Sequence, residues 1–134
     1  MKHYDPDRTP DPQEWLALDE QERIHLVEAH HRAARVELPN VTVHACFHAM
    51  VENQIAEGLE STTRAMTRLT REGLSRHDAL HAIGSVTAEL FYEMMKTKEK
   101  GAENTTAARF NAAVERLTAK EWKRRFGSPT DEAP

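Results

Sequence analysis

The stretch from His44 to His81 constrains the fold of this chain more than any other part. It contains two His-x-x-x-His pairs, His44 with His48 and His77 with His81. Residues four apart lie on one face of an α-helix, so each pair can direct two imidazoles toward one point. The pattern predicts two separate helices that each present a pair of ring nitrogens.

The helix that carries the first pair is expected to run from about residue 41 to residue 57. His44 and His48 lie within its apolar stripe, and Glu52 lies at the edge of that stripe, next to His48. These two histidines are therefore expected to face the core. The stripe itself consists of Val43, Phe47, Met50, Val51 and Ile55.

Caps and breakers divide the rest of the chain into further helices. Asp11-Pro12 starts a short helix, Asp19 and Glu22 form an expected capping box for the next one, Ser61 is expected to cap another, and Gly58 and Gly73 are expected stops. No stretch shows the alternation of a β-strand. The longer helices are predicted at about residues 20–36, 41–57, 61–71, 75–98 and 105–126.

The sequence therefore predicts an all-α fold, a single-domain helical bundle of five or six helices. One domain would span residues 1–134, with an extended lead-in at 1–10 and a frayed tail at 128–134. The helices at about residues 41–57 and 75–98 are the third and fifth when the short first helix is counted. They are expected to pack near each other, because that packing would bring the two histidine pairs together.

Composition limits the classes of partner and compartment. A net charge of −4 and a pI near 6.1 argue against nucleic-acid binding. No apolar run approaches a membrane span, and the first residues lack the apolar core of a signal peptide. A single cysteine, Cys46, excludes an intrachain disulfide. We expect a cytoplasmic protein with no nucleic-acid or membrane partner, and a homodimer is left open.

Convergence of the two pairs would create a metal site. The expected ligands are His44, His48, His77, His81 and Glu52, with Glu89 or His31 as further ligands or partners of ligands. Imidazole nitrogen suits Zn²⁺, Fe²⁺ and Ni²⁺, and Mn²⁺ also accepts it, so the identity of the divalent metal ion stays open. The favoured function is a divalent-metal-binding helical-bundle protein, with a metal-dependent enzyme of unknown substrate left open.

The competing hypothesis is a structural or interaction module, with a homodimer as one form, whose histidines only pack and hydrogen-bond. A third interpretation reads His77-Asp78-Ala-Leu-His81 as a zinc-protease HExxH motif with Asp in place of Glu. Asp is one methylene shorter than the general-base Glu, and no substrate-aligning strand is evident, so this interpretation is disfavoured.

Two family resemblances bear on the same residues. His48-x-x-x-Glu52 followed by His77-x-x-x-His81 resembles the middle of the hemerythrin pattern, which implies a di-iron centre in a four-helix bundle. His25, His30 or His31 could then serve as first-helix ligands. The final-helix ligands of that family are missing, because no histidine follows His81.

The chain more closely resembles a group of uncharacterised bacterial domains of unknown function. They share an HxxxH motif, an E-N-Q element and a later H-[ED]-x-x-H motif. The resemblance implies a helical fold and a metal site, and it implies no particular reaction. The matching positions are His44, His48, Glu52-Asn53-Gln54, His77, Asp78, His81 and Glu89.

Overall fold

A computed structural model of the chain describes residues 1–33, 41–97 and 103–126. These ranges contain seven α-helices and no strand, so the all-α prediction is confirmed and the count of five or six helices is wrong. The helices are α1 (Pro12–Ala17), α2 (Glu20–Ala33), α3 (Val41–Ala56), α4 (Glu60–Arg71), α5 (Arg76–Thr97), α6 (Glu103–Arg116) and α7 (Ala119–Phe126).

The additional helix arises because the predicted 105–126 helix is broken in two. Thr118 caps α7 by accepting a 3.1 Å hydrogen bond from the Glu121 N–H. Arg68 of α4 donates to the carbonyls of Val114 and Leu117 at 2.8–3.1 Å, which satisfies carbonyls at the end of α6. A tertiary contact thus supports the break, and no Pro or Gly marks it in the sequence.

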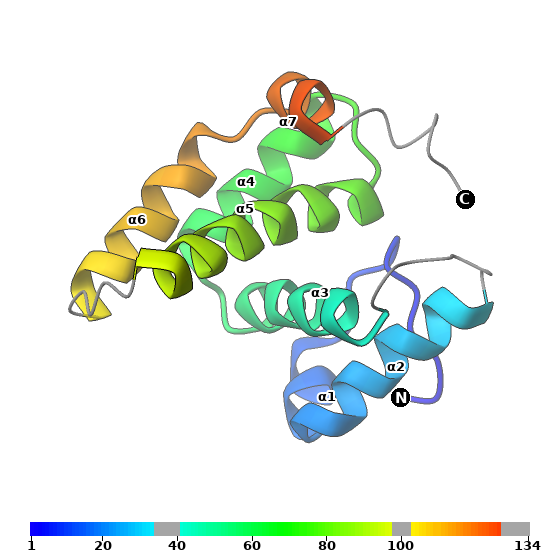
Figure 1. Ribbon diagram of the computed structural model, residues 1–134. Helices are drawn as coiled ribbons and strands as arrows, with labels where there is room; N and C mark the ends of the chain where they lie inside the picture. The colour runs from blue at the N-terminus through cyan, green and yellow to red at the C-terminus, as the bar shows by residue number, and fades with distance from the viewer. Residues whose placement is uncertain (34–40, 98–102, 127–134) are drawn as a thin grey trace.

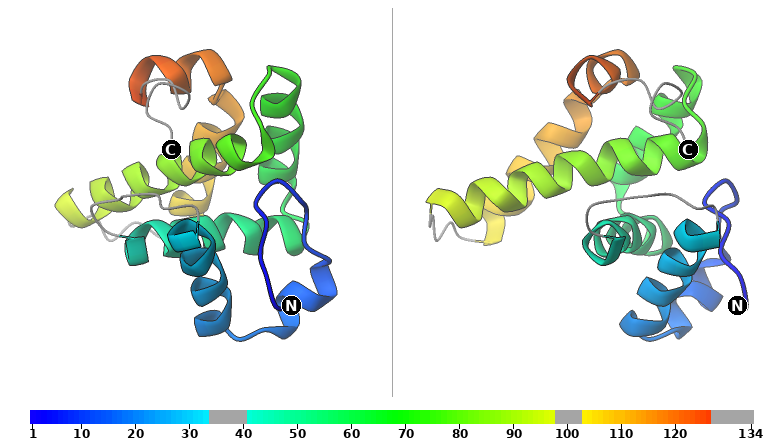
Figure 2. Two further views of the ribbon diagram at one scale, coloured as in Figure 1. Left: turned by 90° about the vertical axis from the view of Figure 1, so that its right-hand side faces the viewer. Right: turned by 45° about the vertical axis from the view of Figure 1, so that its right-hand side comes forward.

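Helix α3 occupies the middle of the molecule. It packs against α1 and α2 on one side and against α5 on the other, as Figures 1 and 2 show. Helices α4, α6 and α7 pack around α5. The expected proximity of the third and fifth helices, α3 and α5, is therefore confirmed.

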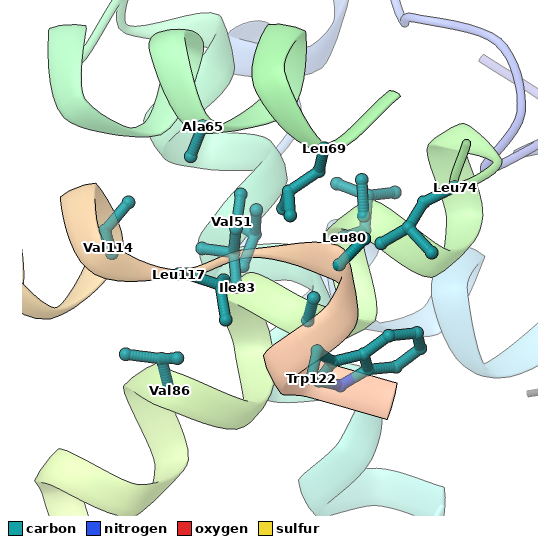
Figure 3. Close-up of a cluster of buried hydrophobic side chains, with 13 residues drawn as sticks. Val51, Ala65, Leu69, Leu74, Leu80, Ile83, Val86, Val114, Leu117 and Trp122 are labelled. Atoms are coloured by element: carbon teal, nitrogen blue, oxygen red, sulfur yellow. The ribbon is translucent and has the colours of Figure 1, made fainter. Parts of the chain in front are cut away.

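Two apolar clusters form the core on either side of this central helix. The larger one joins α3 to α4, α5, α6 and α7, and Figure 3 shows Trp122 of α7 near its lower edge. The smaller one gathers Tyr4, Trp15 and Val27 against Ala45 and Ala49 of α3. Because α3 supplies side chains to both clusters, polar groups on it can lie where the two meet.

Several local helix signals match the prediction. Asp19 and Glu22 exchange the two hydrogen bonds of a capping box, at 2.8 and 3.3 Å. Gly58 and Gly73 end their helices with φ of 75° and 105°, which favours glycine. Ser61 is wrong as a cap, because it is buried inside α4 and donates a hydrogen bond to Asn111.

Some expected features lie outside the described residues, namely the end of α2 at Val36 and the tail at 128–134. The lead-in at residues 1–10 has no helix, yet Tyr4 and Pro6 in it are buried. The Pro6 carbonyl accepts a 2.8 Å hydrogen bond from Arg76 at the start of α5. Within the described part of the chain, no helix has the length and apolar character to cross a membrane.

Candidate metal centre

Four histidines from three helices meet at the boundary between the two apolar clusters. They are His31 of α2, His44 and His48 of α3, and His81 of α5. One ring nitrogen of each lies within 4.8 Å of one ring nitrogen of every other. Two of the rings share a hydrogen bond, with His44 Nε2 and His81 Nε2 3.1 Å apart. These four residues are called the histidine cluster below.

Small residues let the three helices approach closely enough for these rings to meet. Ala45 and Ala49 are fully buried beside the two histidines of α3, on the side that packs against Val27 of α2. On α5, a Cβ atom at Gly84 would lie only 4.0 Å from Val51 of α3. The helix axes are therefore close on both sides of α3, and imidazoles are long enough to span the gaps.

The ring of His31 is held in one tautomer. Its Nδ1 lies 2.8 Å from the Val27 carbonyl oxygen, which can only accept a hydrogen bond. Nδ1 therefore carries the hydrogen, and Nε2 carries the lone pair. That Nε2 is buried and has no hydrogen-bonding partner among the described residues. The ring thus presents an unused lone pair to its surroundings.

A chain of buried polar groups fixes the tautomer of His48 as well. Its Nε2 lies 2.7 Å from the Tyr4 hydroxyl oxygen, and that hydroxyl donates its only hydrogen to Glu52. Burial, and then the charge of Glu52, raise the pKa of Tyr4 above its ordinary value, so the hydroxyl keeps this hydrogen. His48 Nε2 must therefore be the donor to Tyr4. The lone pair falls on Nδ1, which is buried and without a partner in residues 1–33, 41–97 and 103–126.

Glu52 anchors this chain of hydrogen bonds and does not join the histidine cluster. It is 1% exposed, and Arg76 donates to both of its carboxylate oxygens at 2.8 Å. Such a paired geometry lets a buried charge persist, because both partners remain hydrogen-bonded. Glu52 therefore orients His48 through Tyr4, in the manner of a group that positions a metal ligand.

The cluster histidines are held in the neutral form that metal binding requires. Burial is the largest cause, and the neighbouring imidazoles add to it. Together they lower the pKa of His44 to about 4 and that of His81 to about 2. Burial also lowers the pKa of His31, and it lowers that of His48 well below its ordinary value. The rings are thus uncharged near neutral pH, and only the hydrogen shared between His44 Nε2 and His81 Nε2 would have to move to the other nitrogen of its ring before both could bind an ion.

His77 lies next to the cluster without belonging to it. Its ring centroid is 4.2 Å from that of His81, and its buried Nε2 finds no partner in the described structure. Burial and nearby histidines lower its pKa to about 4. Of the other candidates, Glu89 forms an ion pair with Arg125 of α7. Three of the five expected ligands thus come together, and His31 is the fourth member of the group.

Sequence reasoning missed Tyr4 and Arg76, which tie Glu52 to His48. Tyr4 lies in a segment without helical periodicity, and Arg76 stands at the start of a helix, where a basic residue usually faces solvent. Neither position carries a signal that could have revealed its role. Their function depends on the tertiary approach of residues 1–10 to α3 and α5.

The histidine cluster can offer a metal ion up to four uncharged ring nitrogens as ligands. On His31 and His48, a hydrogen bond made by one ring nitrogen fixes the lone pair on the other.

Comparisons with protein-family models, with curated proteins and with solved structures find no match to this chain.

Proposed function

We propose that this protein binds a divalent metal ion through His31, His44, His48 and His81. The observation that carries the proposal is the pair of buried lone pairs on His31 Nε2 and His48 Nδ1. Both are acceptors whose tautomers are set by hydrogen bonds on the far side of the ring. One cation placed among the four rings would accept both lone pairs at once.

The spacing of the nitrogens supports this proposal. Two imidazole nitrogens bound to one tetrahedral Zn²⁺ at about 2.0–2.1 Å lie about 3.3 Å apart. His44 Nε2 and His81 Nε2 are separated by 3.1 Å, which is close to that value. The remaining nitrogens lie within 4.8 Å, so small side-chain rotations would complete the site.

The donor set limits the metals to consider. Four neutral imidazoles without a thiolate favour Zn²⁺, Fe²⁺ or Ni²⁺ over Mg²⁺ and Ca²⁺, which prefer oxygen. The di-iron analogy receives less support, because carboxylates bridge or flank such pairs in helical bundles. Glu52 is the buried carboxylate that Tyr4 links to His48, and Arg76 donates hydrogen bonds to both of its oxygens.

The competing interpretation, in which the histidines only pack, leaves a cost unexplained. Each buried polar atom without a partner costs about 1–3 kcal/mol. The described residues leave three histidine nitrogens in that state, on His31, His48 and His77. A purely structural role gives no reason to retain several such atoms at one place, whereas a metal ion supplies the missing partner for two of them.

The decisive experiment is a set of single alanine variants of the untagged protein, analysed for metal content and by titration with Zn²⁺, Fe²⁺ and Ni²⁺. We expect His31→Ala, His48→Ala and His81→Ala each to abolish stoichiometric uptake. His25→Ala is the matched control, because His25 is exposed on α2 and lies outside the cluster. It should bind metal as the unchanged protein does.

His77→Ala distinguishes the four-histidine site from the ligand set expected from the sequence pairs. The proposal predicts that this variant keeps its metal, since His77 lies outside the cluster. If the unchanged protein takes up none of the three metals and its melting temperature does not respond to them, the proposal fails. If His31→Ala binds metal normally while His77→Ala does not, the metal lies elsewhere among the rings.

A further inference from the structure

A pocket of about 250 Å³ opens beside the histidine cluster, between α3, α5 and α7. His44, His48 and His81 form one wall of this pocket. Three of the four proposed ligands therefore line the pocket, and a molecule inside it would lie beside any ion that the cluster holds.

Apart from these histidines and Ser85, the lining is apolar or aromatic. It includes Phe47, Leu80, Ala88 and Trp122. A cavity of about 150 Å³ accommodates benzene, so this pocket has room for a molecule of about ten non-hydrogen atoms. Its size and walls suit one small ring or a branched chain with a single polar group.

Trp122 supplies an unused hydrogen-bond donor at this pocket. Its side chain is 5% exposed, and its indole Nε1 is buried with no acceptor in the part of the chain that the structure describes. An indole N–H can only donate, and a buried one usually has a partner. The other tryptophan, Trp15, follows that rule by donating to Asn53 at 2.8 Å. Because Nε1 itself is buried, a turn of the indole would be needed to bring this donor to an acceptor on a ligand in the pocket.

Charge indicates what kind of acceptor is needed. A divalent ion held by four neutral imidazoles keeps both of its positive charges. Glu52 cannot offset them, because it is already paired with Arg76. A buried cation of this kind favours an anion close by even when the four imidazoles fill its coordination positions, and a carboxylate has a second oxygen that can accept a hydrogen bond from an N–H donor.

We propose that the pocket binds a small, largely apolar carboxylate, with Trp122 donating to one of its oxygens. This inference rests on the proposed metal site, because the ion supplies the charge that selects an anion. It adds a ligand class to that site and assigns Trp122 as a binding residue. Benzoate is the probe that matches the pocket in size and chemistry.

The test is a titration of the full-length, Zn²⁺-loaded protein with benzoate, followed through the indole N–H resonances in a two-dimensional NMR spectrum. We expect the resonance of Trp122 to shift and that of Trp15 to stay, because Trp15 already has its acceptor. Benzamide, which is uncharged, and toluene, which has no acceptor, are the matched probes. Both should bind more weakly than benzoate, and toluene should bind most weakly.

Two variants complete the test. Trp122→Phe keeps a flat ring and removes the donor, so the dissociation constant for benzoate should rise about fivefold while zinc content is unchanged. Ala88→Leu should fill the pocket and block benzoate without touching a histidine. If Trp122→Phe does not fold, Ala88→Leu and the titration of the unchanged protein still decide the matter.

The outcomes separate the two proposals. If zinc binds but benzoate leaves the Trp122 resonance unmoved, or toluene binds as tightly as benzoate, the carboxylate site is overturned and the metal site stands. If zinc itself does not bind, both proposals fall.

Discussion

Tyr4 links the segment that precedes α1 to His48 of the histidine cluster. Its hydroxyl accepts from His48 and donates to Glu52, which Arg76 holds in place. A tyrosine is suited to this position because one oxygen can do both, whereas a carboxylate could only accept. The result is a proposed metal ligand whose orientation is set by three groups beyond its ring, namely Tyr4, Glu52 and Arg76.

Replacing Tyr4 with Phe tests this link. The ring would still pack against Trp15, at 5.6 Å between centroids, but His48 Nε2 would lose its acceptor. Loss of a group that orients a ligand typically weakens metal binding by about 10–100-fold. We expect that loss in a competition titration with a chromogenic chelator. Tyr92→Phe, at an exposed position on α5, is the control and should change nothing. Equal affinities for the two variants would contradict the link.

The lowered pKa values of the buried histidines predict how the metal-free protein responds to acid. In the unfolded chain these imidazoles take up protons near pH 6.5. In the folded protein His44 and His77 resist protonation until about pH 4, and His81 until about pH 2. The unfolded state therefore binds more protons below pH 6.5, so the free energy of unfolding must fall as the pH falls.

This loss should amount to about 1.4 kcal/mol per pH unit for each such histidine between pH 6.5 and 4.5. Urea unfolding of the metal-free protein at a series of pH values measures it. His81→Gln removes one of the titrating groups and should flatten the curve. A free energy of unfolding that stays constant over this window would show that the rings are already protonated or accessible in the folded state.

At the scale of whole helices, Arg68 stabilises the break between α6 and α7. It reaches from α4 to the carbonyls of Val114 and Leu117, and Glu72, the residue that follows α4, accepts from the Ala119 N–H at 2.7 Å. Both contacts favour a break between α6 and α7. That break turns α7 across the larger cluster, where Trp122 becomes a wall of the pocket.

Arg68→Ala should therefore lower the free energy of unfolding by about 1–3 kcal/mol, mainly the cost of leaving the buried Leu117 carbonyl without this donor, because the Val114 carbonyl keeps the Leu117 N–H. Chemical denaturation followed by circular dichroism measures this change. Arg71→Ala, at an exposed position on the same helix, should stay within about 0.5 kcal/mol of the unchanged protein. Similar values for the two variants would show that solvent satisfies those carbonyls.

The sequence predicts features that depend on one helix at a time. The spacing of His44 and His48, the capping box of Asp19 and the stop at Gly58 are all local, and the structure bears them out. The helix break near Thr118 and the role of Tyr4 depend on contacts between distant parts of the chain. Periodicity says which face a residue occupies, but it does not say which residue of another helix meets it.

The same limit explains the candidate ligands. His77 and His81 share a helix face, yet the sequence could not tell which of them reaches His44. From the sequence His31 is only a further candidate, and the packing of α2 against α3 brings it into the cluster. Glu52 has the right spacing for a ligand, but the partly buried Arg76 of α5 forms an ion pair with its carboxylate.

For the molecule as a whole, the histidine cluster is where two separate apolar cores meet. His31 belongs to the helix pair that packs on the smaller cluster, and His81 belongs to the long helix of the larger one. A metal ion bound by both would fasten the two cores together. Metal binding would therefore raise the free energy of unfolding of the whole molecule, because unfolding of either core would release the ion.

We therefore expect a large thermal effect of metal. With free metal at about 100 times its dissociation constant, the free energy of unfolding should rise by about 2.7 kcal/mol. Calorimetry with and without a chelator measures this rise and shows whether the two cores then unfold in one transition. The His48→Ala variant, measured at the same metal concentration, should show no rise. A rise of equal size in that variant would mean that the metal binds somewhere else.

The segment before α1 has a practical consequence for anyone who handles this protein. It contributes no ligand, yet its tyrosine and the Pro6 carbonyl hold the groups that aim His48. A protease cut just ahead of Pro12, or a bulky affinity tag fused to Met1, would disturb the orientation of His48 without altering any histidine of the cluster. Preparations that differ only in their N-terminal trimming should then differ in how firmly they keep zinc during dialysis.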